Sequence, residues 1–356
     1  MSTNDMVQDS KTVPIDKSKL TDILGGCEIA ILDEVNVSDE RKFTKLELTQ
    51  EQQMQMSGLM NQLPALLNVA SLSKTVRLTF PKGVQGSLMP LKNGGYSTTL
   101  VDKAGKIVGT ASLNVPTFQA TALSAFTAMS IASGQYLLAQ INSNLGEISS
   151  KLDKILEFLY GDKRAELLSE VNFINFAHEN YKSVMEHSEQ RIATLVSLQS
   201  AKKVAMKDIE FYLSDLDSDS KKKKKDTWIA KKMLRTHECL ELSLQLYAMS
   251  NLLEVYYSEN FDPNYTCFVE KEAANYIGTC ANRSLNCFSR LQERLSGAKN
   301  PVQIEAANKV NAIVERMNGI ITSPLLTELR STLGETSKEK QYYLTQDGGV
   351  YLLKAS

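Results

Sequence analysis

Residues 107–146 have the sequence IVGTASLNVPTFQATALSAFTAMSIASGQYLLAQINSNLG, which contains no Asp, Glu, Lys, Arg or His, although charged residues make up 23% of the chain. Because a charge is costly where water is excluded, a charge-free run of this length indicates a segment that spends time away from water. We predict that residues 117–140 form a helix that is either buried or inserted. The patterns on both sides of this helix decide the fold.

An apolar seam follows directly along the chain, and its members recur at alternating intervals of three and four residues. They are Leu138, Ile141, Leu145, Ile148, Leu152, Ile155 and Leu159. This spacing is typical of a helix packed against other helices, and the flanking positions lack the opposite charges that would select a partner chain. The seam predicts either packing against this chain's own helices or homo-oligomerisation, and the sequence leaves both open.

Helical periodicity continues for most of the chain after the uncharged run. We expect helices at about residues 117–160, 163–217 with one break, 226–258, 265–297 and 302–334, separated by Gly, Pro and Asn turn signals. Long helices joined by short loops form antiparallel bundles. Residues 116–335 are therefore predicted to be a long antiparallel helical bundle.

Strand patterns occur before the uncharged run, in residues 18–115. Short apolar runs near the start of this region indicate short strands, and residues 76–80 alternate apolar and polar as a half-buried strand requires. The turn pair Asn93-Gly94 lies between further strand-like runs. Residues 87–113 are therefore predicted to be a three-stranded β-meander.

One helix is predicted within the same region. Thr49 and Gln52 have the spacing of a capping box, in which the two side chains satisfy backbone N–H groups at the start of a helix. Apolar residues at helical spacing follow, from Leu59 to Leu67. Pro64 falls inside this pattern and is expected to kink or split the helix.

The end of the sequence again carries strand-like runs, around the turn Asp347-Gly348-Gly349. We predict a hairpin over residues 336–356, which could rejoin the N-terminal sheet, and a disordered tail over residues 1–17. The predicted fold class is thus α+β, predominantly α. It combines a long antiparallel helical bundle with an N-terminal β-meander region and a short C-terminal β-hairpin.

Composition argues against several classes of function. The 40 basic and 41 acidic side chains give a net charge of −1, so no nucleic-acid partner is expected. The five cysteines are never spaced as C-x-x-C, which predicts neither a disulfide framework nor a zinc site and favours a cytoplasmic location. The first residues lack the pattern of a secretory signal.

Catalytic and cofactor motifs are also missing. The sequence contains no G-x-S-x-G, no phosphate-binding G-x-x-x-x-G-K-[ST], no H-E-x-x-H and no G-x-G-x-x-G. His237 and Cys239 are close in sequence, but no second pair stands at metal-ligand spacing. We therefore expect no cofactor, no metal and no enzymatic activity, although residues distant in sequence could still assemble an active site.

A lysine run is the densest local charge. It consists of Lys221, Lys222, Lys223, Lys224 and Lys225. Consecutive lysines attract phosphate or an anionic lipid surface, which makes the run a candidate anion patch. Aspartates on both sides would cancel much of its field, so a solvated loop between two helices is the alternative.

The uncharged helix has a membrane interpretation as well as a packing one. The candidate membrane residues are Leu123, Ser124, Phe126, Ala128, Ile131 and Ala132. The small residues among them recur at four-residue spacing, which permits close helix approach in lipid or in a protein core. A charge-free helix beside a long bundle resembles the architecture of α-helical pore-forming proteins, and that resemblance implies a stored segment that is released into a membrane.

These patterns predict a non-enzymatic helical-bundle protein that acts by self-association. In the membrane hypothesis, residues 117–140 insert into a membrane after oligomerisation along the seam, and the protein is cytoplasmic until it is activated. In the alternative, it is a soluble scaffold or adaptor whose uncharged helix fills the core. The sequence identifies no protein partner.

Overall fold

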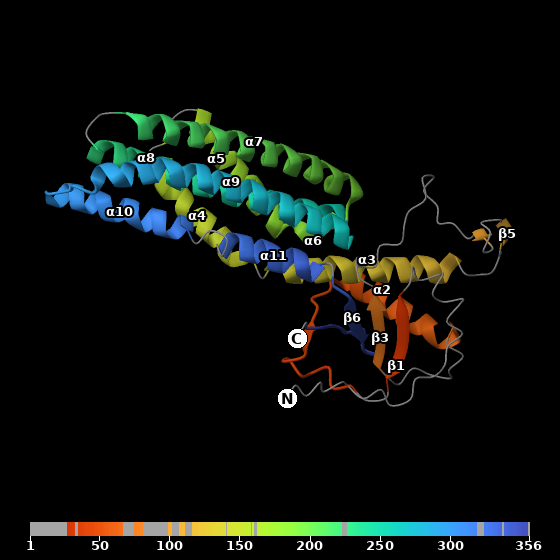
Figure 1. Cartoon of the computed structure of the whole chain (residues 1–356). Coiled ribbons are helices and arrows are strands. Elements are labelled where there is room, and N and C mark those ends of the chain that lie inside the picture. The colour runs from red at the N-terminus through yellow and green to blue at the C-terminus, as the bar shows by residue number, and fades with distance from the viewer. Residues whose placement is uncertain are drawn as a thin grey trace. The chain divides into compact units, whose positions relative to one another are not determined.

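The structure, a computed structural model, describes residues 27–32, 35–66, 75–80, 99–101, 107–110, 116–139, 141–157, 159, 162–222, 226–318, 324–336 and 338–354. Within them the chain is mostly helical and carries a small five-stranded antiparallel sheet, which confirms an α+β, predominantly α fold (Figure 1). The chain divides into two compact units. The sheet unit comprises residues 1–136 and 337–356, and the helical unit comprises residues 137–336.

The sheet has the spatial order β1-β3-β6-β7-β2, and all neighbouring strands are antiparallel. The strands are β1 (Glu28–Leu32), β2 (Phe43–Lys45), β3 (Thr75–Phe80), β6 (Lys340–Leu344) and β7 (Val350–Leu353). Tyr342 of β6 lies opposite Leu78 of β3, and β7 pairs with β2. The C-terminal strands β6 and β7 are thus flanked on both sides by N-terminal strands.

The alternation in β3 separates the two faces of the sheet. Its three apolar residues are all buried, in a core shared with α2 (Gln50–Leu66) and α3 (Pro116–Ala139). The ring of Phe80 lies edge-on to the ring of Phe126 in α3, with 5.0 Å between centroids. A smaller cluster around Tyr343 packs on the opposite face. The larger of the two cores is therefore the one beneath the helices.

The helix α2 begins with the predicted capping box. The backbone N–H of Gln52 donates to Oγ1 of Thr49 at 3.2 Å, and the backbone N–H of Thr49 donates to Oε1 of Gln52 at 3.0 Å. Of the kink or split expected at Pro64, the split is wrong, because α2 runs unbroken to Leu66. A proline in the last turn removes one backbone hydrogen bond near a helix end, where few bonds remain to be lost.

Two further strands, β4 (Thr99–Val101) and β5 (Ile107–Thr110), pair as a separate two-stranded antiparallel sheet. They fall within the meander predicted over residues 87–113. The first strand of that meander and its Asn93-Gly94 turn lie outside the described residues, as does the tail predicted over residues 1–17.

The helical unit contains helices that pack side by side, most of them long (Figure 1). They are α4 (Asn142–Leu156), α5 (Asp162–Glu179), α6 (Tyr181–Met185), α7 (Ser188–Lys221), α8 (Asp226–Ser258), α9 (Pro263–Leu295), α10 (Pro301–Asn318) and α11 (Pro324–Thr336). The helix α8 contacts α4, α5, α7, α9, α10 and α11, and all of residues 242–253 are buried. Burial on every face makes α8 the core of this unit.

The single helix expected over residues 117–160 is wrong, because the structure has two helices there, α3 and α4. Ile141 leaves helical geometry, with φ −97° and ψ 10°, and its N–H donates to the carbonyl of Leu138 at 3.1 Å in a tighter turn. The Asn and Ser residues that follow Ile141 favour a new helix start over a helix interior. Ile141 is nevertheless buried, as are Leu138 before the break and Leu145 after it, so the heptad positions stay buried across the break.

Two other helix predictions also differ from the structure. The helix expected over residues 163–217 breaks twice rather than once, at Asn180 and at residues 186–187. The helix expected over residues 302–334 is present as α10 and α11, and α11 begins at Pro324, as suits a residue without an N–H.

The helical unit begins at residue 137 rather than at the expected residue 116, because most of α3 packs on the sheet core. Residues 128–134 of α3 are buried all round the helix. Burial in a protein core is thus one sufficient cause for the lack of charge in this segment. None of the helices within the described ranges is long and apolar enough to cross a membrane.

Candidate functional site

A groove of about 580 Å³ opens in the helical unit between α4, α8 and α10. Its basic lining residues are Lys151, Lys154, Lys231, Arg235, Lys309 and Arg316, and its acidic ones are Glu238 and Glu241. Its apolar lining comes from Ile155, Leu234, Ala312 and Ile313. The groove therefore combines an excess of positive charge with an apolar wall.

Helical spacing explains how these side chains come together. The helix α4 buries its seam residues within the unit, which leaves Lys151 and Lys154 beside the groove. On α8, Lys231 and Arg235 are four residues apart and share one face. The two basic residues of α10 are two turns apart on the same face. Each of these three helices thus contributes two basic side chains from one face to the groove.

Three charged or polar side chains form a cluster in the groove. Arg316 Nη2 lies 2.5 Å from Glu241 Oε1 and 3.3 Å from His237 Nε2, and His237 Nε2 lies 3.4 Å from Glu241 Oε1. Burial alone would raise the pKa of Glu241, but His237 and the nearby cations Arg316 and Lys151 hold that pKa below its usual value. Glu241 is therefore an ionised carboxylate that takes up part of the hydrogen-bonding capacity of Arg316.

One ring nitrogen of His237 has no partner. The side chain is buried, and its Nδ1 makes no hydrogen bond within the described part of the chain. Nε2 lies within reach of both Arg316 and Glu241, so Nδ1 is left as a donor when Nε2 accepts from Arg316 and as an acceptor when Nε2 donates to Glu241. A buried polar group without a hydrogen-bond partner costs about 1–3 kcal/mol. Nδ1 of His237 is therefore an unsatisfied buried atom beside the ion pair.

Two cations of the groove are open to a ligand. Over the described residues, no carboxylate is paired with Lys154 or Lys231. By contrast, Lys309 pairs with Glu305 at 2.7 Å on its own helix. Ammonium and guanidinium groups that converge in this way bind phosphate or carboxylate oxygens through charge-assisted hydrogen bonds.

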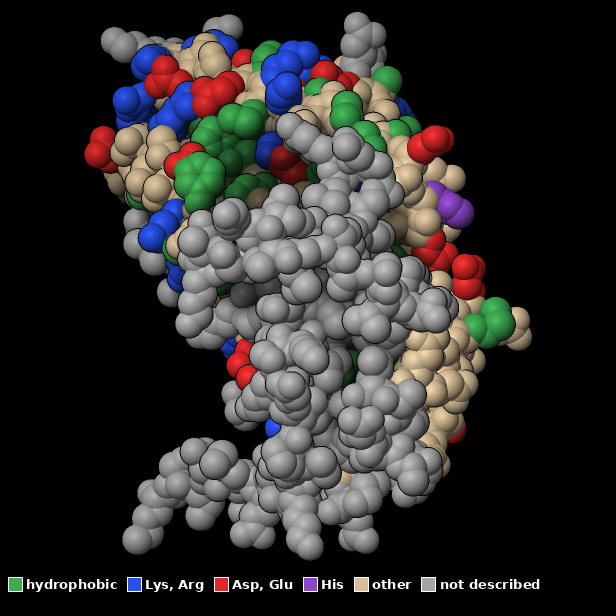
Figure 2. Space-filling view, turned by 90° about the vertical axis from the view of Figure 1, so that its right-hand side faces the viewer, with side chains coloured by type: hydrophobic (Ala, Val, Ile, Leu, Met, Phe, Trp, Pro, Cys, Tyr) green, Lys and Arg blue, Asp and Glu red, His purple; other side chains and the backbone are tan. Residues whose placement is uncertain are grey.

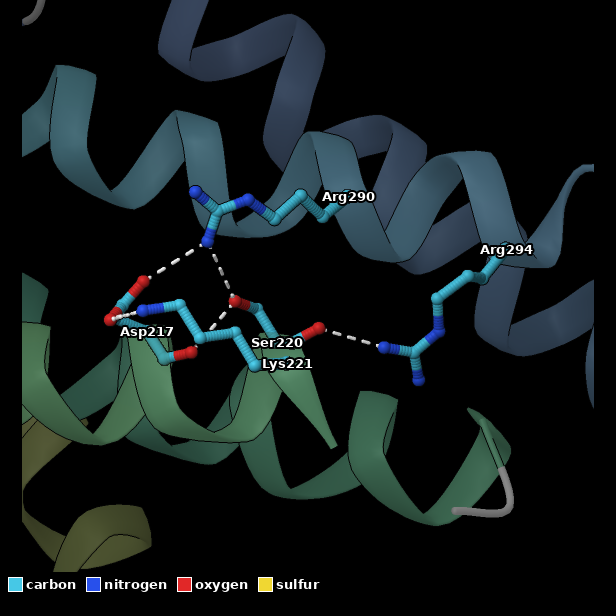
Figure 3. A network of polar contacts seen from close by, with 5 residues as sticks. All are labelled: Asp217, Ser220, Lys221, Arg290 and Arg294. Carbon is cyan, nitrogen blue, oxygen red and sulfur yellow. Dashed lines mark hydrogen bonds and ion pairs between the residues drawn. The ribbon is translucent and has the colours of Figure 1, made fainter. Parts of the chain in front are cut away.

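The lysine run identified in the sequence is held by its acidic neighbours where the structure describes it. Lys221 pairs with Asp217, which is also 3.0 Å from Nη1 of Arg290 (Figure 3). Lys222 pairs with Asp219 at 2.5 Å. The other three members, Lys223, Lys224 and Lys225, lie outside the described residues. The two described lysines are thus neutralised locally, whereas Lys154 and Lys231 of the groove are paired with no carboxylate among the described residues.

The same network closes the end of α7 against α9. Arg290 Nη1 also donates to Oγ of Ser220 at 3.3 Å, and Arg294 Nη1 donates to the carbonyl of Ser220 at 2.8 Å (Figure 3). The bond from Arg294 satisfies a carbonyl in the last turn of α7, where no later helical N–H is available. The lysine run therefore belongs to a helix-capping network in its described part.

The seam residues are used inside this chain. Leu138, Ile141, Leu145, Ile148, Leu152 and Ile155 are buried, whereas Leu159 is half-buried and follows the end of α4. Among the candidate membrane residues, Phe126, Ala128, Ile131 and Ala132 are buried and Ser124 is half-buried. The side chain of Leu123 lies outside the described residues.

The face shown in Figure 2 has acidic and basic side chains intermixed across its upper part. This mixture agrees with the net charge of −1. On that face the described charges do not gather into one broad patch of a single sign.

Sequence reasoning missed the groove because its basic residues are spread over three helices. The signals that the sequence does carry are short-range spacings, such as Lys151 with Lys154 and Lys231 with Arg235. Among the described residues, no group of His, Cys, Asp and Glu is arranged to hold a metal ion. No family model matches the chain, and no curated protein or solved structure is significantly similar to it.

Proposed function

We propose that this chain is a non-enzymatic binding protein whose helical unit takes a phosphate group in the basic groove. The observation that carries the proposal is the convergence of six Lys and Arg side chains on a groove lined by two carboxylates. A phosphate dianion satisfies more of these donors than a single carboxylate does. The apolar lining suits the organic part of a phosphate ester.

Each part of the site has a distinct role in this proposal. Lys154 and Lys231 supply charge that no described carboxylate cancels. Arg316 offers a planar pair of donors once it leaves Glu241. His237 lies beside Arg316 in the groove, and its edge-on contact with Phe288, 5.3 Å between centroids, holds the ring in place. The groove therefore combines two lysines that no described carboxylate cancels with Arg316, which must leave Glu241 before it can bind a ligand.

The test is a titration of the full chain with inorganic pyrophosphate. Trp228 is the only tryptophan, is 54% exposed and precedes Lys231 by about one turn of α8, so its fluorescence can report binding beside the groove. Calorimetry gives the affinity independently. We expect the affinity to fall as salt is added, because exposed charges are screened.

The decisive variant is Lys154→Glu combined with Lys231→Glu, which should weaken pyrophosphate binding at least about tenfold, since each reversal removes an attraction and adds a repulsion. Lys203→Glu is the matched control, because Lys203 is exposed on α7 and does not line the groove. Equal affinity of the double variant and the control would contradict the proposal.

A further arm separates the sources of the phosphate group. Vesicles of phosphatidylcholine with and without phosphatidic acid test a lipid headgroup, and pyrophosphate competes with them if the groove is shared. Binding to pyrophosphate without flotation on either vesicle indicates a soluble ligand. A scaffold that instead receives an acidic peptide would bind pyrophosphate weakly.

Self-association along the seam and membrane insertion of residues 117–140 are separate proposals. The first requires the buried seam residues to be uncovered, and sedimentation of the full chain over a wide concentration range tests it. The second is favoured by one observation, that α3 has no charged side chain over its 24 residues. Flotation on the phosphatidylcholine vesicles tests this second proposal.

A further inference from the structure

A cluster of carboxyl groups lies at the contact between α5 and α7, and it shares no residue with the groove. Glu166 and Glu170 are one turn apart on α5, and Asp208 faces them from α7. Asp208 is 0% exposed and Glu170 is 8% exposed. Two of the three carboxyl groups are therefore closed to water, whereas the Glu166 side chain is 26% exposed.

The cations of this cluster serve two of the three carboxyl groups. Lys163 Nζ bonds Asp208 and lies 2.7 Å from Glu166 Oε2, and Lys207 Nζ lies 3.2 Å from Glu166 Oε1. Glu170 Oε1 is buried and has no hydrogen-bond partner in the described part of the chain, and the same holds for Asp208 Oδ2. Glu170 is thus the carboxyl group for which no cation is positioned.

A carboxyl group that is buried beside other carboxyl groups keeps its proton. Burial, followed by the charges of Asp208 and Glu166, raises the pKa of Glu170 to about 8, against the opposing effect of Lys163 and Lys207. Burial also raises the pKa of Asp208, although Lys163 opposes it. Glu170 is therefore the member of the cluster that changes charge near neutral pH.

The groups behind Asp208 do not titrate in the same range. Tyr212 on α7 interacts with Asp208, and burial raises its pKa above the usual value of 10.0. Cys239 on α8 also interacts with Asp208, and burial raises its pKa to about 12. Both side chains stay neutral while Glu170 ionises.

We infer that a proton retained on Glu170 holds α5 against α7, so that the helical unit contains a proton-dependent contact that loosens as the solution becomes alkaline. The direction of this pH dependence follows from the linkage between proton binding and folding. The carboxyl group binds its proton more tightly in the folded chain than at its usual pKa of 4.5, so its stabilisation is full below that value and is lost as the pH rises through about 8.

Hydrogen exchange of the full chain, read by mass spectrometry on peptides from α5, tests the inference. The variant is Glu170→Gln, which is neutral at every pH, and the control is Glu179→Gln, an exposed position on the same helix. Comparison of chains at the same pH cancels the intrinsic pH dependence of exchange. Between about pH 7 and pH 9.5, protection of wild-type α5 should fall about tenfold relative to Glu170→Gln, and the control should follow the wild type. A ratio that stays constant over this range overturns the inference.

Two further measurements keep the test decisive if the glutamine variant does not fold. In the wild-type chain with ¹³C-labelled glutamate, one side-chain carboxyl resonance should titrate near pH 8, and titration of every glutamate below about pH 6 overturns the inference. In Asp208→Asn, the loss of a neighbouring negative charge should move that titration to lower pH. If the titration midpoint is the same in Asp208→Asn and in the wild type, the assignment of this titration to Glu170 beside Asp208 is overturned.

Discussion

Arg316 on α10 and Glu241 on α8 form an ion pair across the groove, with Nη2 of the arginine 2.5 Å from Oε1 of the glutamate. The carboxylate also lies 3.4 Å from Nε2 of His237. An anion that enters the groove therefore competes with Glu241 for the guanidinium group. Glu241 in this way limits the affinity of the groove for anions.

The variant Glu241→Gln should bind pyrophosphate about three- to tenfold more tightly, because removal of one competing charge near a surface is worth about 1 kcal/mol. Calorimetry at low salt measures the change. Glu210→Gln is the control, since Glu210 pairs with Arg283 away from the groove lining. Weaker binding by Glu241→Gln would show that Glu241 positions Arg316 rather than competing for it.

The variant Ala128→Lys should destabilise the sheet unit by several kcal/mol, because Ala128 is 2% exposed and its neighbours offer a packed apolar core. Denaturant unfolding followed by near-ultraviolet circular dichroism measures the loss. The matched control is Thr127→Lys, which adds the same charge to a half-buried neighbouring position of α3. Equal stability of the two variants would contradict the packing of α3 described here.

The variant Gly348→Ala should cost about 1–2 kcal/mol in the sheet unit. Gly348 has φ +79°, and an added Cβ would lie 3.1 Å from Oγ of Ser57. Thermal unfolding measures the shift. Gly297→Ala serves as the control because, apart from its chain neighbours, no described residue lies within 4 Å of its added Cβ, and it should leave the midpoint almost unchanged.

The variant Asp262→Ala should cost about 1 kcal/mol in the helical unit, because Asp262 caps the start of α9. Its Oδ1 accepts from the backbone N–H groups of Asn264 at 2.9 Å and Tyr265 at 3.0 Å. Urea unfolding followed by far-ultraviolet circular dichroism measures the change. Asp262→Asn keeps the acceptor oxygen and should recover most of the stability, and an equal loss in both variants would assign the effect to charge instead of capping.

Local patterns in the sequence were sufficient where neighbouring residues decide the structure. The capping box of Thr49 and Gln52 and the alternation over residues 76–80 both depend on short-range geometry, and both are present. The break at Ile141 could not be found in this way. Burial of Ile141 keeps the heptad pattern intact, so the periodicity of the seam is the same with or without a turn at this point.

The groove was out of reach of sequence reasoning for a different reason. Its cations come from α4, α8 and α10, and their convergence depends on how these helices pack. The lysine run is the densest charge in the sequence because its members are consecutive, but that density does not show which acidic side chains pack against it. In the structure, Lys221 and Lys222 pair with aspartates of α7, which only their three-dimensional neighbours reveal.

The position of β6 between β3 and β7 has a consequence for synthesis of the chain on the ribosome. The strands β1 and β3 emerge early, but β6 is translated only after the whole helical unit. Until then, the β3 edge that β6 will cover presents unpaired N–H and C=O groups, which are prone to pair with other chains. The N-terminal strands therefore wait for strands that are translated last. Translational arrest before Lys340 would release a chain that lacks β6 and β7 and cannot form the five-stranded sheet.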